Sequence, residues 1–325
     1  DESLSKILKD RKNNGNYDMD GIIVTNGMKH KRNTSGNPKY AFAFKDLLEN
    51  MIKKAKVVSI DWKISKDGKI IPTLNLEPVE FEGVTVSRVT AHNAAFILKN
   101  KINKGTELKI TRSGDVIPYI LEVTKSSKHP GMPDMKYKWS KTKVHILIDG
   151  TNDTVKLRNL QYFFSMIDAK GFGPKVVQKL FESNFNSIET VMKMKPKDYL
   201  TIENFKEKTA NKLTVNLKEA LNDILLEKLM SASNIFGSGF GQKRIKAILG
   251  VYPNILTDYK KWKKQEFIDM IISIEGFDTI TASQFVSKFK DYVKFHKLIK
   301  KFIKIKKNKV IKKSIDMTVV MSGFR

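Results

Sequence analysis

The sequence contains DGIIV at residues 20–24 and PKYAFAFK at residues 38–45, and both stretches have the pattern of a buried strand. In the first, an acid and a glycine lead directly into an apolar, β-branched run. In the second, aromatic residues alternate with alanines, so one face of a strand would be aromatic and Lys45 would lie at its end. A carboxylate at Asp20 and an ammonium group at Lys45 suit a metal or a phosphate. Either run alone also fits an ordinary core strand.

Three further motifs follow along the chain. They are LEPV at residues 76–79, VSRVTAHN at residues 86–93 and RSGDVIP at residues 112–118. In their order and spacing, the five motifs resemble those of the NAD-dependent DNA ligase family. The resemblance is close from about residue 17 to residue 118 and looser beyond. It implies that the first two stretches are strands of a nucleotidyltransferase pocket and that LEPV forms a turn.

The resemblance implies roles for three residues of the first two stretches. Asp20 would support a metal or the adenylated phosphate, and Gly21 would let the strand approach the nucleotide. Lys45 would neutralise the charge that develops on phosphate. These three residues are therefore predicted to be catalytic and to bind the cofactor. NAD and Mg²⁺ are the implied cofactors, and no metal ligand set is assigned within this chain.

Two departures from the family pattern concern the chemistry. The family nucleophile is the lysine of a Lys-x-Asp-Gly motif, which does not occur in these 325 residues. A second family lysine is replaced by Thr25, so either Lys29 or Lys31 supplies the charge or adenylation is impaired. The chain begins at Asp1 and ends on a strand-like run, and we expect it to be a piece of a longer polypeptide.

The composition favours a nucleic-acid partner. Sixty Lys and Arg residues against 34 Asp and Glu residues give a formal net charge of +26, which attracts a polyanion and makes binding depend on salt. The sequence lacks the run of about 18 apolar residues that a membrane span needs, and it lacks an amino-terminal signal pattern. These features predict an intracellular protein without a membrane partner. The sequence leaves the oligomeric state open.

Short β-rich segments separated by turns fill residues 47–125. Strands of this length without a long helix between them indicate a small closed barrel, and the resemblance identifies it as an OB-fold. Basic residues of the barrel would then follow DNA phosphates, and a solvated face with scattered lysines is the alternative. The family usually has arginine where this chain has Lys66. The residues predicted to contact DNA phosphates in this half of the chain are Lys39, Lys66, Arg88 and Arg112.

Residues 126–155 differ most from the family pattern. The family has a four-cysteine zinc module in this region, whereas this chain contains no cysteine. We therefore predict a linker without zinc, in which a strand and turn at residues 144–150 replace the metal by packing. The absence of the module suggests a viral or otherwise divergent member of the family.

The pattern becomes helical over residues 156–304, and this region contains two glycine-rich turns. They are GFGPK at residues 171–175 and GSGFGQKR at residues 237–244. Such turns expose backbone amides at a helix N-terminus, which can bind phosphate. The resemblance identifies them as helix-hairpin-helix motifs, of which two more, at residues 204–208 and 275–278, have lost glycines. The DNA-binding residues predicted here are Gly171, Gly173, Gly237, Gly239, Lys243 and Arg244.

The predicted fold class is multidomain α+β, with nucleotidyltransferase strands, an OB-fold barrel and an all-α helix-hairpin-helix domain. The predicted function is part of an NAD-dependent DNA ligase that seals nicks in duplex DNA through an AMP–DNA intermediate, in replication or repair. A non-catalytic DNA-binding ligase remnant is one alternative. An RNA ligase or capping nucleotidyltransferase is another alternative, although it would lack the helix-hairpin-helix motifs.

The predicted domains are an adenylation-domain end at 1–46, an OB-fold at 47–125, a linker at 126–155, a helix-hairpin-helix domain at 156–304, a basic linker at 305–313 and a BRCT start at 314–325.

Overall fold

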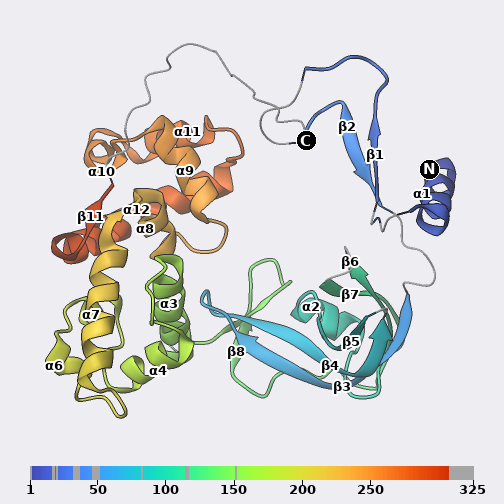
Figure 1. Cartoon of the computed structure of the whole chain (residues 1–325), viewed down its shortest axis with the longest axis horizontal. Coiled ribbons are helices and arrows are strands. Elements are labelled where there is room, and N and C mark those ends of the chain that lie inside the picture. The colour runs from blue at the N-terminus through green and yellow to red at the C-terminus, as the bar shows by residue number, and fades with distance from the viewer. Residues whose placement is uncertain are drawn as a thin grey trace. The chain divides into compact units, whose positions relative to one another are not determined.

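The chain divides into two compact units, Asp1–Gly150 and Thr151–Arg325 (Figure 1). The predicted BRCT start, most of the predicted basic linker and Asp20 lie outside the described residues. Within the part of the chain that the structure describes, no helix has both the length and the apolar character needed to cross a membrane. The computed structural model describes residues 2–16, 19, 21–31, 37–45, 52–81, 83–113, 117–150 and 152–306.

The first unit opens with a helix and a two-stranded hairpin. Both strands predicted from the first two stretches are present, and they pair antiparallel. The predicted burial is wrong, because neither strand contains a buried residue and Ile23 and Phe42 are 76% and 57% exposed. Val24 lies opposite Phe42, and Ile22 lies opposite Phe44. Because directly opposed residues of an antiparallel pair share a face, these four side chains form one apolar face of the hairpin. The elements are α1 (Glu2–Asn14), β1 (Ile22–Thr25) and β2 (Ala41–Phe44).

Five strands of the first unit form an antiparallel barrel. The hydrogen-bonded order is β7-β6-β3-β4-β5, and β5 also lies alongside β7. A short helix, α2 (Ala94–Lys99), connects the third strand of the barrel to the fourth. This arrangement is that of the predicted OB-fold. The strands are β3 (Lys53–Ile64), β4 (Lys69–Phe81), β5 (Val84–Thr90), β6 (Glu107–Ser113) and β7 (Ile117–Lys125).

Strand β3 belongs to both sides of the barrel. Its first four residues pair with β6, and from Val57 onward it pairs with β4. The pairing register shifts between Val57 and Ser59, and such an irregularity bends a strand and increases its twist. The bend lets one strand turn the corner of the barrel. Alternate side chains, among them Val57, Leu74 and Leu76, fill the barrel core.

The LEPV motif lies inside β4, so the predicted turn at residues 76–79 is wrong. Strand β4 pairs with β5 on both sides of the motif, and the register shifts between Asn75 and Val79. Proline lacks the N–H that a regular ladder uses, and Pro78 is accommodated at this irregularity. Pairing with a neighbouring strand therefore keeps this segment extended, where the family resemblance implied a turn.

Residues 126–150 pack onto the barrel and extend its sheet. The predicted strand near residue 146 is present, and it pairs with β4. Ile146 is fully buried in a small core, which is surrounded by partly buried tryptophans, methionines and a tyrosine. The Trp62 indole N–H donates to the carbonyl of Gly131 at 3.1 Å. The two added strands, which pair with each other, are β8 (Tyr137–Trp139) and β9 (Ile146–Ile148).

Replacing Ile146 by alanine is expected to lower the free energy of unfolding by about 2–4 kcal/mol, because it leaves a cavity in this small core. A metal chelator is expected to leave the melting temperature unchanged, because we predict that packing takes the place of zinc. Thermal unfolding with and without chelator measures both effects. The matched control is Lys138→Ala on the same hairpin, whose side chain is 63% exposed. A chelator-dependent fall in melting temperature would contradict the packing explanation.

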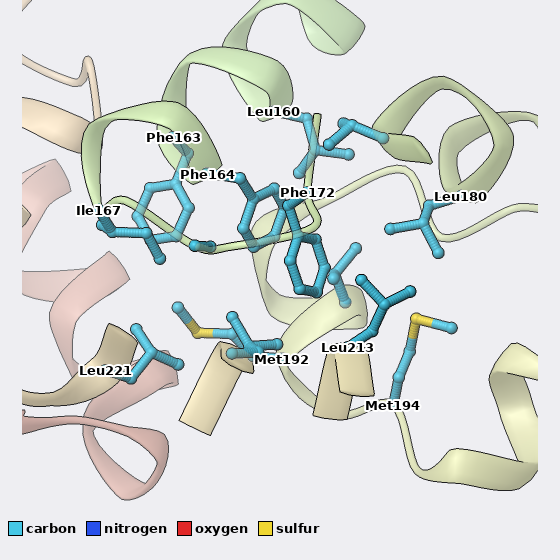
Figure 2. Close-up of a cluster of buried hydrophobic side chains, with 14 of the residues drawn as sticks. Leu160, Phe163, Phe164, Ile167, Phe172, Leu180, Met192, Met194, Leu213 and Leu221 are labelled. Carbon is cyan, nitrogen blue, oxygen red and sulfur yellow. The ribbon is translucent and has the colours of Figure 1, made fainter. Parts of the chain in front are cut away.

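The second unit is helical and contains two hydrophobic cores. The first core takes side chains from α3 to α8 and Ile299 from α12, and Figure 2 shows Phe172 and Leu213 within it. The second takes side chains from α8 to α12, including Phe240 and Phe277. Phe295 packs against both cores. The longer helices are α3 (Asp153–Met166), α4 (Pro174–Glu182), α7 (Glu207–Leu221), α8 (Leu226–Ala232), α9 (Gln242–Val251), α11 (Lys264–Ile272) and α12 (Thr279–Ile299).

Shorter elements complete the helical unit. Two short strands pair in parallel and bring the segment after α12 back to the residues between α7 and α8. The Lys306 N–H adds a hydrogen bond to the Ile224 carbonyl at 2.8 Å. The short elements are α5 (Ile188–Met192), α6 (Pro196–Tyr199), α10 (Ile255–Asp258), η2 (Tyr259–Lys261), η3 (Lys300–Phe302), β10 (Asn222–Ile224) and β11 (Lys304–Ile305).

Candidate nucleic-acid interface

The helical unit contains four turns that share one backbone geometry. In each turn a residue with positive φ precedes a phenylalanine, whose N–H donates to the carbonyl three residues earlier. The next residue is the N-cap of α4, α7, α9 or α12. We name them turn 1 (Gly171-Phe172-Gly173), turn 2 (Asn204-Phe205-Lys206), turn 3 (Gly239-Phe240-Gly241) and turn 4 (Gly276-Phe277-Asp278).

The phenylalanines anchor these turns in the hydrophobic cores. Phe172 stacks on Phe164 with ring centroids 4.8 Å apart (Figure 2). Turn 2 keeps the shared geometry without a glycine, because Asn204 adopts a φ of +66°. Asparagine tolerates this left-handed region better than most residues. The segment at residues 204–208 therefore keeps the turn, although its sequence lacks the glycines of the motif.

The N-caps of the four turns differ in what covers the helix amides. Gly173 and Gly241 provide no side-chain cap, and a Cβ added at either would meet no atom within 4 Å. In turn 4, the Asp278 carboxylate accepts a hydrogen bond from the Thr281 N–H at 2.8 Å, and this bonding lowers the pKa of the carboxyl group. A carboxylate of the chain thus occupies in turn 4 the place that an external anion could take in turns 1 and 3.

The residue two positions after the N-cap also distinguishes turn 4 from the other turns. The second helical residue is Lys175, Lys208 and Lys243 in turns 1 to 3, and Arg244 adds a further charge in turn 3. In turn 4 this position is Ile280, whose side chain is 77% exposed. Open amides beside a lysine are suited to phosphate, because both favour negative charge. Turns 1 and 3 have both features, and turn 4 has neither. Turn 2 also lacks a side-chain cap, but its N-cap is Lys206 and its first helical residue is the acidic Glu207.

The predicted glycines have two distinct roles. Gly171, Gly237 and Gly239 have φ values of +87°, +78° and +94°, so they permit backbone conformations that other residues rarely adopt. Gly173 has an ordinary φ of −67°, so the backbone does not require a glycine there. Its lack of a side chain instead leaves the cap open.

Gly241 is a candidate site residue that the sequence prediction missed. The prediction lists Gly237 and Gly239, whereas in the structure Gly239 and Gly241 correspond to the two glycines of turn 1. The tripeptide Gly-Phe-Gly occurs in both turns and is the signal that could have identified Gly241.

The outer face of β3, β4 and β5 contains the predicted barrel residue Arg88. It lies opposite Asn75, which lies opposite Ser59. The Arg88 guanidinium contacts the Asp61 carboxylate at 2.7 Å, and both side chains are about half exposed. Exposed ion pairs contribute at most about 1 kcal/mol, so a phosphate could replace Asp61 as the partner of Arg88.

The other two predicted barrel residues lie at strand ends. Lys66 is in the loop between β3 and β4, where it pairs with Asp67 at 3.2 Å. Arg112 lies near the end of β6, opposite Pro118 of β7. In OB-folds the second and third strands, the loop between the first two strands and the loop between the last two bind oligonucleotides. All three predicted residues therefore lie on or beside these elements, although Arg88 and Lys66 contact acidic neighbours and not each other.

The hairpin brings two of the predicted catalytic residues together. A Cβ on Gly21 would lie 2.8 Å from the Phe44 carbonyl oxygen and 2.9 Å from Lys45 Cγ. Glycine at this position therefore lets the start of β1 lie against Lys45. Lys39 is exposed in the turn before β2, and Thr25 is exposed at the end of β1.

The loop after β1 holds the two lysines that could replace the family lysine. Lys29 and Lys31 are both exposed. His30, between them, stacks on Tyr40 with ring centroids 4.0 Å apart, which holds the loop against the start of β2. Among the described residues, no group of three or more His, Asp or Glu side chains is placed to hold a metal ion.

Comparisons with known proteins agree with this arrangement. Residues 54–132 match the family described as the NAD-dependent DNA ligase OB-fold domain. The chain is 40% identical over 331 residues to a DNA ligase of Acanthamoeba polyphaga mimivirus, a match that covers 99% of the chain and 51% of that protein. It is 31% identical over 288 residues to putative DNA ligase 205R of Invertebrate iridescent virus 6, covering 89% of the chain and 45% of that protein.

A third relative extends the same pattern. Putative DNA ligase 052L of Invertebrate iridescent virus 3 is 29% identical over 255 residues, covering 76% of the chain and 33% of that protein. The chain thus spans about half the length, or less, of these relatives. With its OB-fold and these matches, the chain belongs to the NAD-dependent DNA ligase family.

Proposed function

We propose that this chain is the DNA-holding part of an NAD-dependent ligase that seals nicks in duplex DNA. In this proposal, residues 1–46 end an adenylation domain, residues 47–125 form the OB-fold and residues 156–304 form a helix-hairpin-helix domain. The observation that supports it best is the pair of open N-caps, Gly173 and Gly241, each followed by a lysine.

The proposed DNA contact depends on the backbone and not on base edges. First-turn amides of a helix have no intrahelical acceptor, so those of Lys175 and Lys243 can donate to phosphate oxygens. Their ammonium groups add charge-assisted contacts to the same phosphates. Such contacts fix the position of the protein on the duplex without reading sequence. Binding without sequence preference suits an enzyme that must act at any nick.

The proposed chemistry belongs to the longer protein. NAD supplies the adenylyl group when bound, and the nick is sealed when the 3′-hydroxyl attacks the adenylated 5′-phosphate and AMP leaves. Lys45 would place a positive charge where phosphate oxygens gain negative charge. Gly21, which has no side chain, would let the start of β1 lie against Lys45. Asp20 is proposed as a support for phosphate or Mg²⁺. The described residues offer no carboxylate cluster for Mg²⁺, so we derive no step through it.

A non-catalytic DNA-binding remnant is the second candidate, and Thr25 favours it because the family has a lysine at this position. The deciding experiment uses the longer protein with nicked duplex and NAD, and separately with a duplex whose nick is already adenylated. Sealing of both substrates is the expected result. Tight binding of the nick without sealing of either substrate would support the remnant.

Turn 4 offers a gain-of-contact test of the proposed DNA interface. Changing Asp278→Gly together with Ile280→Lys gives turn 4 the open cap and the lysine of turns 1 and 3. We expect the slope of log affinity against log salt to steepen by about one, as one phosphate contact is gained. The variant Asp291→Ala with Leu298→Lys adds the same charge to α12 away from the turn and is the matched control. Equal slopes for the two variants would contradict the proposal.

The same variant should lose the helix cap that Asp278 provides. The loss is expected to lower the melting temperature at neutral pH. Because folding lowers the pKa of Asp278, its stabilising effect is present above the ordinary pKa of an aspartate and is lost as pH falls through the lowered value. Melting curves at several pH values should therefore converge for variant and unchanged chain in acid.

A further inference from the structure

Turns 1 and 3 are each held by an amide side chain from another part of the chain. Asn216 of α7 donates to the Lys170 carbonyl at 2.9 Å. Gln284 of α12 donates to the Phe236 carbonyl at 2.7 Å and to the Ser238 carbonyl at 3.4 Å. We infer that Asn216 and Gln284 are positioning residues that fix the two open turns for phosphate binding. The inference rests on the proposed function.

The turns support one another in pairs. Asn216, which holds turn 1, lies on the helix that follows turn 2, and Lys179 of α4 in return donates to the Glu203 carbonyl beside turn 2 at 3.3 Å. Gln284, which holds turn 3, lies on the helix that follows turn 4. In return, the Arg244 guanidinium of α9 lies 5.8 Å from the ring centroid of Phe277 in turn 4. Turns 1 and 2 also share one hydrophobic core, and turns 3 and 4 share the other.

The held carbonyls lie immediately before the glycines that determine the turn. The Lys170 carbonyl and the Gly171 N–H belong to one planar peptide group, so fixing the carbonyl also fixes the plane that enters the glycine. Ser238 has the same relation to Gly239. Glycine is free to adopt many backbone conformations, so an unsupported turn of this kind would sample several. Holding the carbonyl fixes the turn before phosphate binds, so that binding costs less conformational entropy.

The glycines also make room for these amides. A Cβ on Gly171 would lie 2.9 Å from Leu213 Cδ2 and 3.7 Å from Asn216 Nδ2, and a Cβ on Gly237 would lie 3.1 Å from Gln284 Nε2. Both amide side chains are only partly buried, whereas the apolar side chains around them are buried in the two cores. Truncating either amide therefore removes little buried surface, and we expect its main effect on the turn that it holds.

The test uses the 325-residue chain, a nicked duplex and a salt series. We expect Asn216→Ala and Gln284→Ala each to weaken binding about tenfold and to reduce the salt slope by about one, because one turn loses its phosphate contact. The melting temperature should match that of the controls, Asn211→Ala on α7 and Ser283→Ala on α12. Gln284→Asn keeps the donor on a shorter side chain and should recover part of the affinity.

The outcomes separate this inference from the proposed function. Variant Gly173→Asp/Gly241→Asp blocks both open caps directly and reports on DNA binding itself. If it loses affinity while the amide variants bind like their controls, the positioning role is wrong and the proposed function stands. If it also binds normally, the proposed function fails. A fall in melting temperature with an unchanged salt slope, or loss of the folded state, would show that the amides serve only stability.

Discussion

The double variant Gly173→Asp/Gly241→Asp is expected to bind nicked duplex about a hundredfold more weakly and to melt at the same or a higher temperature. An aspartate at the N-cap accepts hydrogen bonds from first-turn amides, as Asp278 does in turn 4. It stabilises the helix and removes the donors that phosphate needs. Two lost charge-assisted contacts of about 1.5 kcal/mol each account for a factor of this size. Weaker binding without loss of stability is the result expected if the open caps hold phosphate.

Fluorescence anisotropy with a labelled nicked duplex, over a range of salt concentrations, measures this effect. The salt slope should fall by about two, because two phosphates are no longer contacted. The control variant Asn186→Asp/Gly250→Asp adds the same negative charge, and a Cβ at Gly250 meets no atom within 4 Å. If test and control variants weaken binding equally, the loss reflects overall charge, and turns 1 and 3 do not hold phosphate through their caps.

Lys45→Ala in the longer protein is expected to slow AMP transfer to the nick by about a hundredfold or more, the usual effect of removing one preorganised charge. Lys45 lies against Gly21 at the mouth of the β1–β2 hairpin, so its charge is held beside the strand that begins after Asp20. Gly21→Ala should slow transfer as well, since the added methyl group would displace Lys45. Single-turnover transfer from the adenylated protein is the measurement.

Lys39→Ala is the matched control, because Lys39 is exposed in the turn before β2 and is proposed to contact only DNA. It should weaken DNA binding and leave the rate of self-adenylation unchanged. Near-normal nick sealing by Lys45→Ala would remove the catalytic assignment of this lysine, whatever the DNA-binding turns do.

The barrel was predictable because its information is local. Leu74 and Leu76 alternate with polar residues along β4, and this alternation fixes which face is buried. The turn at LEPV, which the family resemblance implied, was predicted wrongly because the motif does not contain the residues with which it pairs. Only the pairing of β4 with β5, which depends on residues beyond the motif, shows that Pro78 lies at an irregularity within the strand.

The candidate site was predictable in part. The sequence located turn 2 as well as turns 1 and 3, but it indicated a degraded motif at turn 2, because the positive φ that Asn204 adopts has no glycine to mark it. The closed cap of turn 4 had a local signal, since Asp278 and Thr281 have the spacing of a capping box. Asn216 had none, because its partner carbonyl is 46 residues away along the chain.

Helix α12 contributes side chains to both hydrophobic cores, with Phe285 in the second, Ile299 in the first and Phe295 against both. Loosening this one helix would expose apolar surface in each core at once. We therefore expect the two pairs of turns to open together, as parts of one cooperative unit with a common opening free energy.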